Sequence, residues 1–358
     1  MKNMLKMSPI IREDIENVYE ALKDQLGKIG GSSWLISGGA GFLGSYFLDL
    51  LSFCNERVFD RPCRVICLEN FISGTPARIQ HLKDDKYIHV IKADIVKPLQ
   101  LTGPFDYIIH AASIASPTFY RKYPLETIEA NVLGLKNLLD LGRTRSLKSF
   151  LYFSTSEVYG DPSPGNIPTP EHYNGNVSCI GPRACYDESK RLGETLAVNY
   201  YRQYGLPVKI VRPFNVYGPG LKLDDKRVIP DFFSDALMRK KIAILSSGRD
   251  TRSFCYVSDA ITGFMAAFLS QYNGEVFNVG NDELEIDIKS LALLVAGLVG
   301  ETAVEFKRST EADYLTDNPR RRCPDLSKAR ALLNYGPAVS LESGLKRTLT
   351  WYKEAYGF

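Results

Sequence analysis

The sequence has no strong excess of charge of either sign. It contains 44 lysines and arginines against 41 aspartates and glutamates, which gives a formal net charge of +3 over 358 residues. Proteins that bind nucleic acids or membrane surfaces through bulk charge carry a larger imbalance. The composition therefore supports neither kind of partner, and we expect neither a nucleic acid nor a membrane to be bound.

Metal-binding cysteine patterns are also missing. The cysteines are irregularly spaced and include no CxxC pair. They are Cys54, Cys63, Cys67, Cys179, Cys185, Cys255 and Cys323. This pattern predicts reduced cysteines, as in a cytosolic protein, and no metal site. The sequence also lacks an apolar run of about 18 residues, and its beginning lacks the apolar core of a signal peptide. We therefore expect a soluble, cytoplasmic protein.

Short apolar segments alternate with helical patterns from residue 33 onwards. The segments are rich in β-branched and aromatic residues, and they are SWLIS, RVICLE, IHVIKADI, FDYIIHAA, SFLYFSTS and PVKIVRPFNV. Helical patterns lie between them, for example over residues 125–141 and 186–204. Alternating strands and helices predict a parallel sheet covered on both faces. The predicted fold class is α/β, with a Rossmann-type doubly wound sheet.

Three parts of the chain differ in pattern. Residues 1–31 form an N-terminal extension, in which apolar residues recur at helical spacing over 8–27. We expect this helix to pack either onto the sheet domain or onto a partner subunit. Residues 32–220 are expected to form the sheet domain, which binds the cofactor inferred below. Residues 221–358 mix helices with brief strands, and we expect them mainly to form a smaller substrate-binding lobe interleaved with the sheet domain.

A glycine-rich turn joins the first strand to a helix in SWLISGGAGFLGSYFLDLL. Gly38, Gly41 and Gly44 have GxxGxxG spacing in the strand–turn–helix context of a dinucleotide site. Gly38 can make the tight turn, Gly41 lets the backbone approach a pyrophosphate, and Gly44 lets the helix pack close to the strand. The helix N-terminus favours phosphate charge. The alternative is a glycine turn with a purely structural role.

Glu69 ends the second predicted strand, near the position where an acidic residue binds the adenosine ribose. A carboxylate there repels a 2′-phosphate, so Glu69 favours NAD over NADP. A solvated charge at the end of a strand is the alternative. Asp94, which ends the third strand, is a weaker candidate for a contact on the adenine side.

Polar residues cluster after two later strands. Ser154, Thr155, Ser156 and Glu157 directly follow SFLYF, and Asn215 follows the strand that ends in RPF. Ligands of open α/β sheets bind outside the carboxyl ends of the strands. Either cluster alone could consist of caps and turns. Together they indicate a single polar crevice.

The segment GPRACYDESKR places a phenol and an ammonium one helical turn apart. Tyr186 and Lys190 are four residues apart and so share a helix face. A cation beside a tyrosine favours the phenolate, which can then accept a proton. A chance pair on a solvated helix is the alternative.

These motifs together resemble a known family. GGAGFLG, STSEVYGD, YxxxK and RPFNVYGP, in this order, are similar to the extended short-chain dehydrogenase/reductase family that acts on nucleotide sugars, also called the NAD-dependent epimerase/dehydratase family. The similarity covers residues 33–355. Within the family, GNVSCIGPRACYDESKR, STSEVYGDP, RSFCYVSD and RRRCPD most resemble the UDP-glucuronate decarboxylases, or UDP-xylose synthases. The resemblance implies NAD as cofactor, a UDP-sugar as substrate and a homodimer formed through helices 125–142 and 186–204.

The resemblance also implies a reaction sequence. Tyr186 would remove the sugar O4 proton, Lys190 would lower the pKa of Tyr186 and hold the nicotinamide ribose, and Thr155 would bind O4. Oxidation at C4 gives a ketone to which the C5 carboxylate is β, so that carbon dioxide can leave. Return of the hydride and addition of a proton at C5 yield UDP-xylose and regenerate NAD.

Further residues receive roles from the same resemblance. Glu157 and Ser156 would act around C5, and Arg322 would orient the substrate carboxylate. The implied catalytic residues are Tyr186, Lys190, Thr155, Glu157, Ser156 and Arg322. The implied cofactor-binding residues are Gly38, Gly41, Phe42, Leu43, Gly44, Glu69, Asn70, Asp94, Ile95, Ala111, Ala112, Ser154, Tyr186, Lys190 and Pro213. The implied substrate-binding residues are Pro117, Tyr120, Glu157, Asn215, Arg227, Arg252, Tyr256 and Arg322.

Other outcomes within the same family stay open. A 4-epimerase shares the oxidation at C4 but needs no residue pair at C5. The 4,6-dehydratases typically carry Asp-Glu where this chain has Ser156 and Glu157, and a serine supplies a proton less readily, which argues against dehydration. The loop EHYNGNVSCIG lacks a tryptophan and a proline expected in decarboxylases, so the identity of the sugar is not determined by this loop. A catalytically silent NAD-binding protein is a further alternative, and the intact Tyr, Lys and Thr set argues against it.

Overall fold

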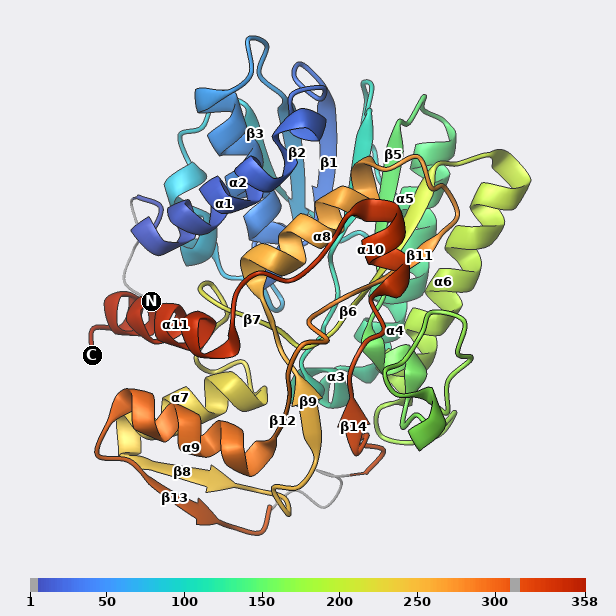
Figure 1. The fold of residues 1–358 in the computed structure, drawn as a ribbon. Coiled ribbons are helices and arrows are strands. Elements are labelled where there is room, and N and C mark those ends of the chain that lie inside the picture. The colour runs from blue at the N-terminus through green and yellow to red at the C-terminus, as the bar shows by residue number, and fades with distance from the viewer. Residues whose placement is uncertain (1–5, 310–315) are drawn as a thin grey trace.

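The fold is built around a seven-stranded sheet, seen in a computed structural model that describes residues 6–309 and 316–358. The strand order is β11-β6-β5-β4-β1-β2-β3, and every neighbouring pair is parallel (Figure 1). The strands are β1 (Ser33–Ser37), β2 (Arg64–Glu69), β3 (Ile88–Lys92), β4 (Tyr107–His110), β5 (Ser149–Phe153), β6 (Val208–Pro213) and β11 (Val276–Val279). This sheet confirms the predicted α/β fold class.

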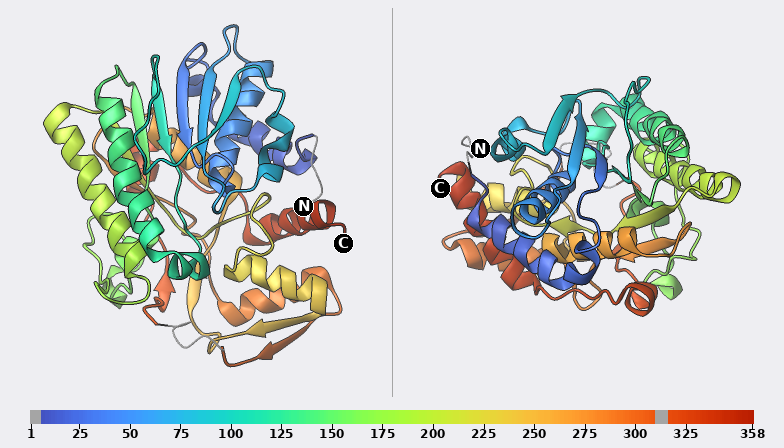
Figure 2. Two further views of the ribbon diagram at one scale, coloured as in Figure 1. Left: turned by 180° about the vertical axis from the view of Figure 1, so that it is seen from behind. Right: turned by 90° about the horizontal axis from the view of Figure 1, so that it is seen from above.

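Helices cover both faces of the sheet (Figure 2). The first face carries α1 (Pro9–Leu26), α2 (Phe42–Arg57), α8 (Val257–Leu269) and α10 (Ser327–Leu333). The second face carries α4 (Pro124–Glu129), a π-helical turn (Ala130–Gly134), α5 (Leu135–Arg143) and α6 (Ala184–Tyr204). Successive strand residues point to opposite faces, so Trp34 and Ile36 of β1 enter one core and Leu35 enters the other.

The remaining elements lie mostly in a smaller C-terminal lobe, at the bottom of Figure 1. They include α7 (Val228–Arg239), α9 (Ile288–Val299), α11 (Leu341–Tyr356) and two parallel strands, β8 (Lys241–Ile244) and β13 (Ala303–Phe306). A three-stranded sheet contains β9 (Thr251–Ser253), β12 (Glu285–Asp287) and β14 (Arg321–Arg322). Short elements α3 (Pro117–Lys122), β7 (Val216–Tyr217) and β10 (Cys255–Tyr256) connect the two parts.

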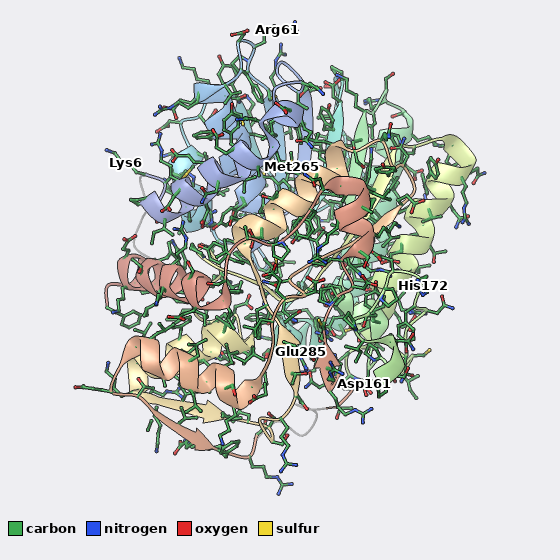
Figure 3. All side chains as sticks on the ribbon, in the orientation of Figure 1. Lys6, Arg61, Asp161, His172, Met265 and Glu285 are labelled. Atoms are coloured by element: carbon green, nitrogen blue, oxygen red, sulfur yellow. The ribbon has the colours of Figure 1, made fainter. Side chains whose placement is uncertain are left out.

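The chain after residue 220 supplies both parts of the molecule. Helices α8 and α10 pack on the large sheet, and β11 is its edge strand next to β6. Met265 of α8 is buried under this packing, in the upper half of Figure 3. The segments between and after these elements return to the smaller lobe. The two parts therefore share several chain crossings instead of one linker.

The N-terminal helix α1 packs onto its own sheet domain. It contacts α8 and α2. Its buried apolar side chains are Ile11, Ile15, Val18, Leu22 and Leu26. Of the two alternatives for this helix, the structure shows packing within the chain. Residues 1–5 of the expected extension lie outside the described residues.

A buried carboxylate on α1 is bonded to residues of α2 and α11 and to the residue that precedes α8. Asp14 of α1 is fully buried and accepts hydrogen bonds from Tyr256 Oη at 3.0 Å, Tyr46 Oη at 3.4 Å and Arg347 Nη2 at 2.7 Å. Tyr46 lies on α2, Tyr256 precedes α8 and Arg347 lies on α11. A buried charge is tolerated only when it is paired and hydrogen-bonded, as Asp14 is.

No helix in residues 6–309 and 316–358 is long and apolar enough to cross a bilayer. Over the same residues, no group of three or more His, Cys, Asp or Glu side chains is arranged to hold a metal ion.

We expect the Asp14→Ala substitution to lower the free energy of unfolding by about 3 kcal/mol, because the buried Tyr256 hydroxyl loses its acceptor and Arg347 loses its buried ionic partner, keeping only the exposed Glu13 as a counter-charge. Urea denaturation followed by circular dichroism measures the change. The control is Glu16→Ala on the same helix, whose side chain is half exposed, and it should change stability by less than about 0.5 kcal/mol. Equal effects of the two substitutions would show that Asp14 does not anchor the helix.

Candidate active site

The glycine-rich turn lies where the carboxyl end of β1 meets α2. Gly38 has φ of +80°, and a Cβ atom there would lie 2.6 Å from the backbone of Ala112. A Cβ at Gly44 would lie 2.1 Å from the carbonyl oxygen of Gly38. Gly41 is the N-cap residue of α2 and has no side chain with which to cap the helix. The first-turn amides of α2 are therefore available to an anion.

A cleft opens beside this turn. It is lined by Gly38, Gly41, Leu68, Glu69, Asn70, Ile72, Ser73, Ala93, Asp94, Ile95, Val96, Ala111, Ala112, Ser113, Ile114, Glu126, Glu129 and Ala130. The lining comes from the carboxyl ends of β1, β2, β3 and β4 and from α4. Eight of the predicted cofactor residues occur in this lining, namely Gly38, Gly41, Glu69, Asn70, Asp94, Ile95, Ala111 and Ala112. The other predicted cofactor residues are not part of it, namely Phe42, Leu43, Gly44, Ser154, Tyr186, Lys190 and Pro213. A side-chain-free turn, an uncapped helix end and an acidic residue fit a dinucleotide.

Glu69 is buried and fixes the shape of this cleft. Its Oε2 accepts the amide of Ala40 at 2.9 Å, and its Oε1 accepts the amide of Phe71 at 3.0 Å. These bonds tie the end of β2 to the glycine turn. The alternative of a solvated charge at the end of a strand does not hold for Glu69, since it is only 6% exposed.

Tyr186 and Lys190 lie on the buried face of α6, against the end of β5. The Lys190 ammonium lies 5.8 Å from the centroid of the Tyr186 ring and donates a hydrogen bond to the carbonyl of Phe153 at 2.7 Å. The hydroxyl of Thr155 is near enough to the Tyr186 phenol to favour its ionised form. Its ring stacks on Tyr120, with centroids 5.0 Å apart and planes 6° from parallel. The structure thus brings the predicted phenol, ammonium and hydroxyl together.

Burial shifts the proton affinities of this pair in opposite directions. Burial raises the pKa of Tyr186 to about 12, and the hydrogen bond from Thr155 opposes the rise. Burial lowers the pKa of Lys190 to about 7, and the carboxylate of Glu194 opposes the fall. Lys190 therefore changes charge near neutral pH, where general acid–base chemistry is most effective.

Glu157 lies between two arginines. It accepts hydrogen bonds from Arg183 Nη2 and from both terminal nitrogens of Arg322, the Arg322 Nη2 to Glu157 Oε2 distance being 2.5 Å. Burial raises the pKa of Glu157, but the charges of Arg183 and Arg322 outweigh burial and hold the pKa at about 2. The carboxylate is therefore ionised at neutral pH. Glu157 follows β5 by way of a short 3₁₀ turn (Ser156–Tyr159), in which Ser156 is also buried.

Arg322 is presented by the short strand β14, which pairs with β9 so that Arg322 lies next to Arg252. The neighbouring residues anchor this strand at the surface. Arg320 is bonded to Asp161, and Arg321 to Glu285 of β12. Asp161 and Glu285 both appear in the lower half of Figure 3. The pairing fixes Arg322 with its guanidinium directed to Glu157.

Arg252 of β9 is buried and held by backbone carbonyls. Its Nη1 donates to the carbonyl of Thr251 at 2.7 Å, and its Nη2 donates to that of Pro319 at 2.6 Å. Burial and the nearby charge of Arg322 lower the pKa of Arg252 to about 10. Arg252 remains positive at neutral pH, so this part of the cleft can receive an anion.

Two further predicted substrate residues lie near Tyr186 and near β9, respectively. Arg227 precedes α7 and is paired with Asp225, and the charge of Arg227 acts on Tyr186. Asn215 has φ of +42° and donates its side-chain amide to the carbonyl of Ser253 at 2.8 Å. Its backbone is therefore fixed next to β9, which carries Arg252.

The structure does not bring Tyr256 to this site. Its side chain is fully buried, and its hydroxyl is bonded to Asp14 and Arg347 in the interior under α1. The prediction of a substrate contact for Tyr256 is corrected to a structural role. The sequence could not show this, because Asp14 is 242 residues away along the chain.

The sequence analysis missed Arg183 and Asp187. Both are buried, and Arg183 contacts Glu157 directly. Asp187 lies 3.8 Å from Arg183 Nε, and burial together with the charge of Glu157 raises the pKa of Asp187 to about 8. A signal was available for Arg183, because it precedes Tyr186 by three residues at the start of the same helical face.

Comparisons with known proteins found similar sequences and similar structures. UDP-glucuronic acid decarboxylase 1 of Arabidopsis thaliana is 39% identical over 320 residues, which cover 89% of this chain and 69% of that protein. Among solved structures, an epimerase of Methanothermobacter thermautotrophicus has a TM-score of 0.80 at 28% identity, covering 95% of this chain and 97% of that chain. A UDP-glucuronic acid 4-epimerase of Bacillus cereus, solved with UDP-glucuronic acid and NAD, has a TM-score of 0.73 at 28% identity, covering 90% of this chain and 100% of that chain.

The model of the family described as "NAD dependent epimerase/dehydratase family" matches residues 34–280. This span includes the glycine turn, Glu69 and the Tyr186–Lys190 pair. The match confirms the predicted NAD dependence. Given this match and the 39% identity to a curated relative, the chain belongs to the NAD dependent epimerase/dehydratase family.

Proposed function

We propose that the protein is an NAD-dependent decarboxylase that converts UDP-glucuronate to UDP-xylose through a 4-keto intermediate. The observation that carries this proposal is the buried ion pair between Glu157 and Arg322, beside the Tyr186–Lys190 pair. A sugar that bears a carboxylate at C5 needs a cation at this place. The support from relatives is the identity to UDP-glucuronic acid decarboxylases, 39% in one case and 37% over 96% of this chain in another.

The first step is oxidation at C4 of the sugar. NAD, when bound, accepts the C4 hydride and later returns it. The glycine turn and Glu69 would hold its adenosine and pyrophosphate, and Lys190 its nicotinamide ribose. Tyr186 would take the O4 proton, since the Lys190 ammonium favours the phenolate, and Thr155 would hydrogen-bond O4.

The second step is loss of carbon dioxide. Once C4 is a ketone, the C5 carboxylate is β to it, and the electrons of the breaking bond can enter an enolate. Arg322 would bind the carboxylate and fix its orientation. Glu157 would release Arg322 to the substrate while remaining paired with Arg183, and with Ser156 it would act at C5. Charge interactions are strong here because the site excludes most water.

The phosphate and uridine end of the substrate would lie along the smaller lobe. Arg252 and Arg227 are the cations proposed for it, and Asn215, which precedes both in the chain, lies next to β9. Pro117 and Tyr120, in α3, would border the sugar from the other side, since Tyr120 stacks on Tyr186. These roles complete the substrate contacts predicted from the sequence, except for Tyr256.

A 4-epimerase is the second candidate, and a specific observation favours it. The Bacillus cereus neighbour with TM-score 0.73 is a 4-epimerase solved with UDP-glucuronic acid, so a carboxylate-binding site alone does not require decarboxylation. Mass spectrometry of the products formed from UDP-glucuronate separates the candidates. A mass loss of carbon dioxide supports decarboxylation, and an unchanged mass with a new retention time supports epimerisation.

We also propose a homodimer formed through helices 125–142 and 186–204. Support comes from apolar side chains exposed on both, including Leu125 at 69%, Leu133 at 46% and Leu192 at 47% exposure. Helices α4 and α6 lie next to each other on one face of the sheet, so these side chains form one surface. A cytoplasmic location is likewise our proposal, which rests on the reduced-cysteine composition.

Removal of the Tyr186 hydroxyl should stop every step. We expect Tyr186→Phe to lower both NADH formation and carbon dioxide release by about 10²–10⁴-fold, the usual effect of losing a general base. Stopped-flow absorbance of NADH, recorded alongside carbon dioxide release, measures both. NADH formation at the parent rate in this variant would refute the assignment of Tyr186.

Removal of Arg322 should impair decarboxylation more than oxidation at C4. We expect Arg322→Ala to weaken binding of UDP-glucuronate by about 1.5–3 kcal/mol, the value of a charged hydrogen bond, and to slow carbon dioxide release more than NADH formation. Glu157→Gln keeps the shape and should leave binding in place while impairing the steps at C5. The control is Arg330→Ala, which removes an arginine paired with Asp282 at the surface. If Arg322→Ala turns over UDP-glucuronate like the parent, the carboxylate assignment is wrong.

The dimer is tested by light scattering at micromolar concentration. The parent should have twice the chain mass, and Leu125→Glu combined with Leu192→Glu should have the mass of one chain, because a buried charge would open the interface. The control is Met238→Glu on α7, which is also an exposed apolar residue, at 61% exposure. A monomeric parent would contradict the proposal.

A further inference from the structure

Three residues of α6 lie against Phe153, Ser154 and Thr155, which are the last residue of β5 and the two residues after it. Tyr186, Lys190 and Glu194 are spaced four residues apart and so lie in one row along the helix. Tyr186 lies near Thr155, Lys190 donates to the carbonyl of Phe153, and Glu194 accepts from Ser154. The first two members of the row form the predicted proton-transfer pair. The third, Glu194, has no role in the function proposed above.

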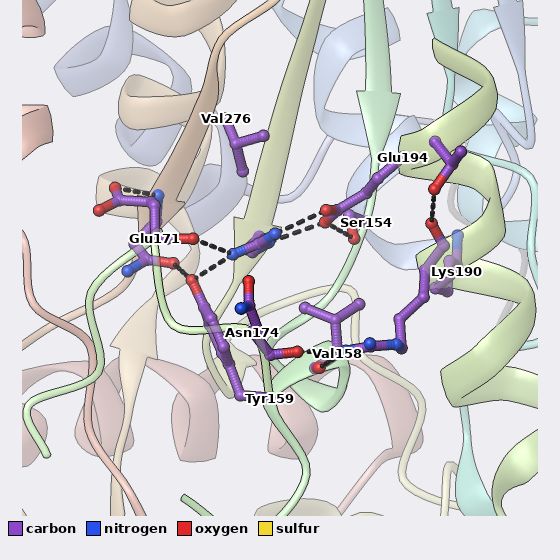
Figure 4. A network of polar contacts seen from close by, with 12 residues as sticks. Ser154, Val158, Tyr159, Glu171, Asn174, Lys190, Glu194 and Val276 are labelled. Carbon is purple, nitrogen blue, oxygen red and sulfur yellow. Dashed lines mark hydrogen bonds and ion pairs between the residues drawn. The ribbon is translucent and has the colours of Figure 1, made fainter. Parts of the chain in front are cut away.

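Glu194 belongs to a network of polar contacts around Arg212 (Figure 4). Its Oε1 accepts the hydroxyl of Ser154 at 2.5 Å and Arg212 Nε at 2.7 Å, and its Oε2 accepts Arg212 Nη2 at 2.6 Å. Arg212, on β6, also donates to the hydroxyl of Tyr159 at 2.7 Å and to the carbonyl of Glu171 at 3.0 Å. A bidentate pair of this kind fixes both position and orientation.

The charged and titratable groups around this network explain why a carboxylate matters there. Lys190 faces His110 of β4 and Tyr152 of β5. Burial lowers the pKa of His110 to about 3 and raises that of Tyr152, so both are neutral at neutral pH. Among the described residues, Glu194 is the carboxylate whose charge favours the protonated form of Lys190, against the burial that lowers its pKa.

We propose that Glu194, held by Arg212, is a positioning residue for the Tyr186–Lys190 pair. Its negative charge keeps Lys190 an ammonium ion in a buried site. Its bond to Ser154 fixes the residue between Phe153 and Thr155, and so aligns the partners of Lys190 and Tyr186. This inference concerns the oxidation at C4 and rests on that part of the proposed function. It does not depend on which sugar is decarboxylated or epimerised.

The test compares charge with shape at position 194. Glu194→Gln keeps the shape and removes the charge, so the pKa of Lys190 should fall by about one unit. The alkaline limb of the pH profile of kcat/KM for NADH formation should move down by the same amount, because activity requires protonated Lys190. Glu194→Asp keeps the charge and should restore the limb to within a few tenths of a unit of the parent value.

Glu194→Gln leaves Arg212 without its ionic partner. A second variant provides the test if this change prevents folding. Glu194→Gln combined with Arg212→Gln removes both charges and can retain an amide–amide hydrogen bond, and it should show the same downward shift. The control is Glu188→Gln on the exposed side of α6, where Glu188 pairs with Arg191, and its profile should match that of the parent. A merely structural role would lower the rate equally at all pH values.

A measurement without substrate separates this inference from the proposed function. The pH dependence of the Lys190 side-chain chemical shifts, recorded by NMR on protein with isotope-labelled lysine, reports the pKa of Lys190 in the folded protein. A lower value in Glu194→Gln supports the inference even if UDP-glucuronate is not turned over. An unchanged pKa and an unchanged alkaline limb would overturn it. Failure of the proposed function would appear instead as a parent enzyme that releases no carbon dioxide.

Discussion

All seven strands of the central sheet run in the same direction, and the candidate site depends on this constraint. The carboxyl ends of parallel strands meet at one edge, where the chain must turn into helices. The turn after β1 bears Gly38, β2 ends at Glu69 and the residues after β5 include Thr155. Each is separated from the others by a helix in sequence, yet the strand pairing brings them to one edge of the sheet. Helix α6 then adds Tyr186 and Lys190 against the end of β5.

The site contains more buried charged groups than a core that contributes only to stability usually has. Glu157, Arg183 and Arg322 are each at least four-fifths buried, and Arg252 lies beside them. Desolvation of such groups costs several kcal/mol each unless partners compensate, and a packed apolar cluster would often be more stable. The arginines are compensated by Glu157 and by backbone carbonyls. A substrate carboxylate can enter this arrangement by exchange of one anion for another, which leaves no cation unpaired.

Much of the fold could be predicted from the sequence because its signals are local. A five-residue apolar strand followed by GGAGFLG determines its own turn, and the spacing of Tyr186 and Lys190 determines their common helix face. Contacts between distant residues could not be predicted in this way. Arg322 meets Glu157 across 165 residues, and the hydroxyl of Tyr256 is taken by Asp14 across 242 residues. Helix α1 shows the same limit, because its apolar pattern identifies the buried face but not the surface that covers it.

The bonds of Asp14 also bear on the order in which the protein can be made. Helix α1 is synthesised first, but Tyr256 and Arg347 follow Asp14 by 242 and 333 residues. On the ribosome, α1 can pack against α2 early, but the parts of its surface that α8 and α11 cover stay exposed until those helices have emerged. Its docking against α8 and α11 can only be a late event of folding. The two ends of the polypeptide, made furthest apart in time, complete the molecule together.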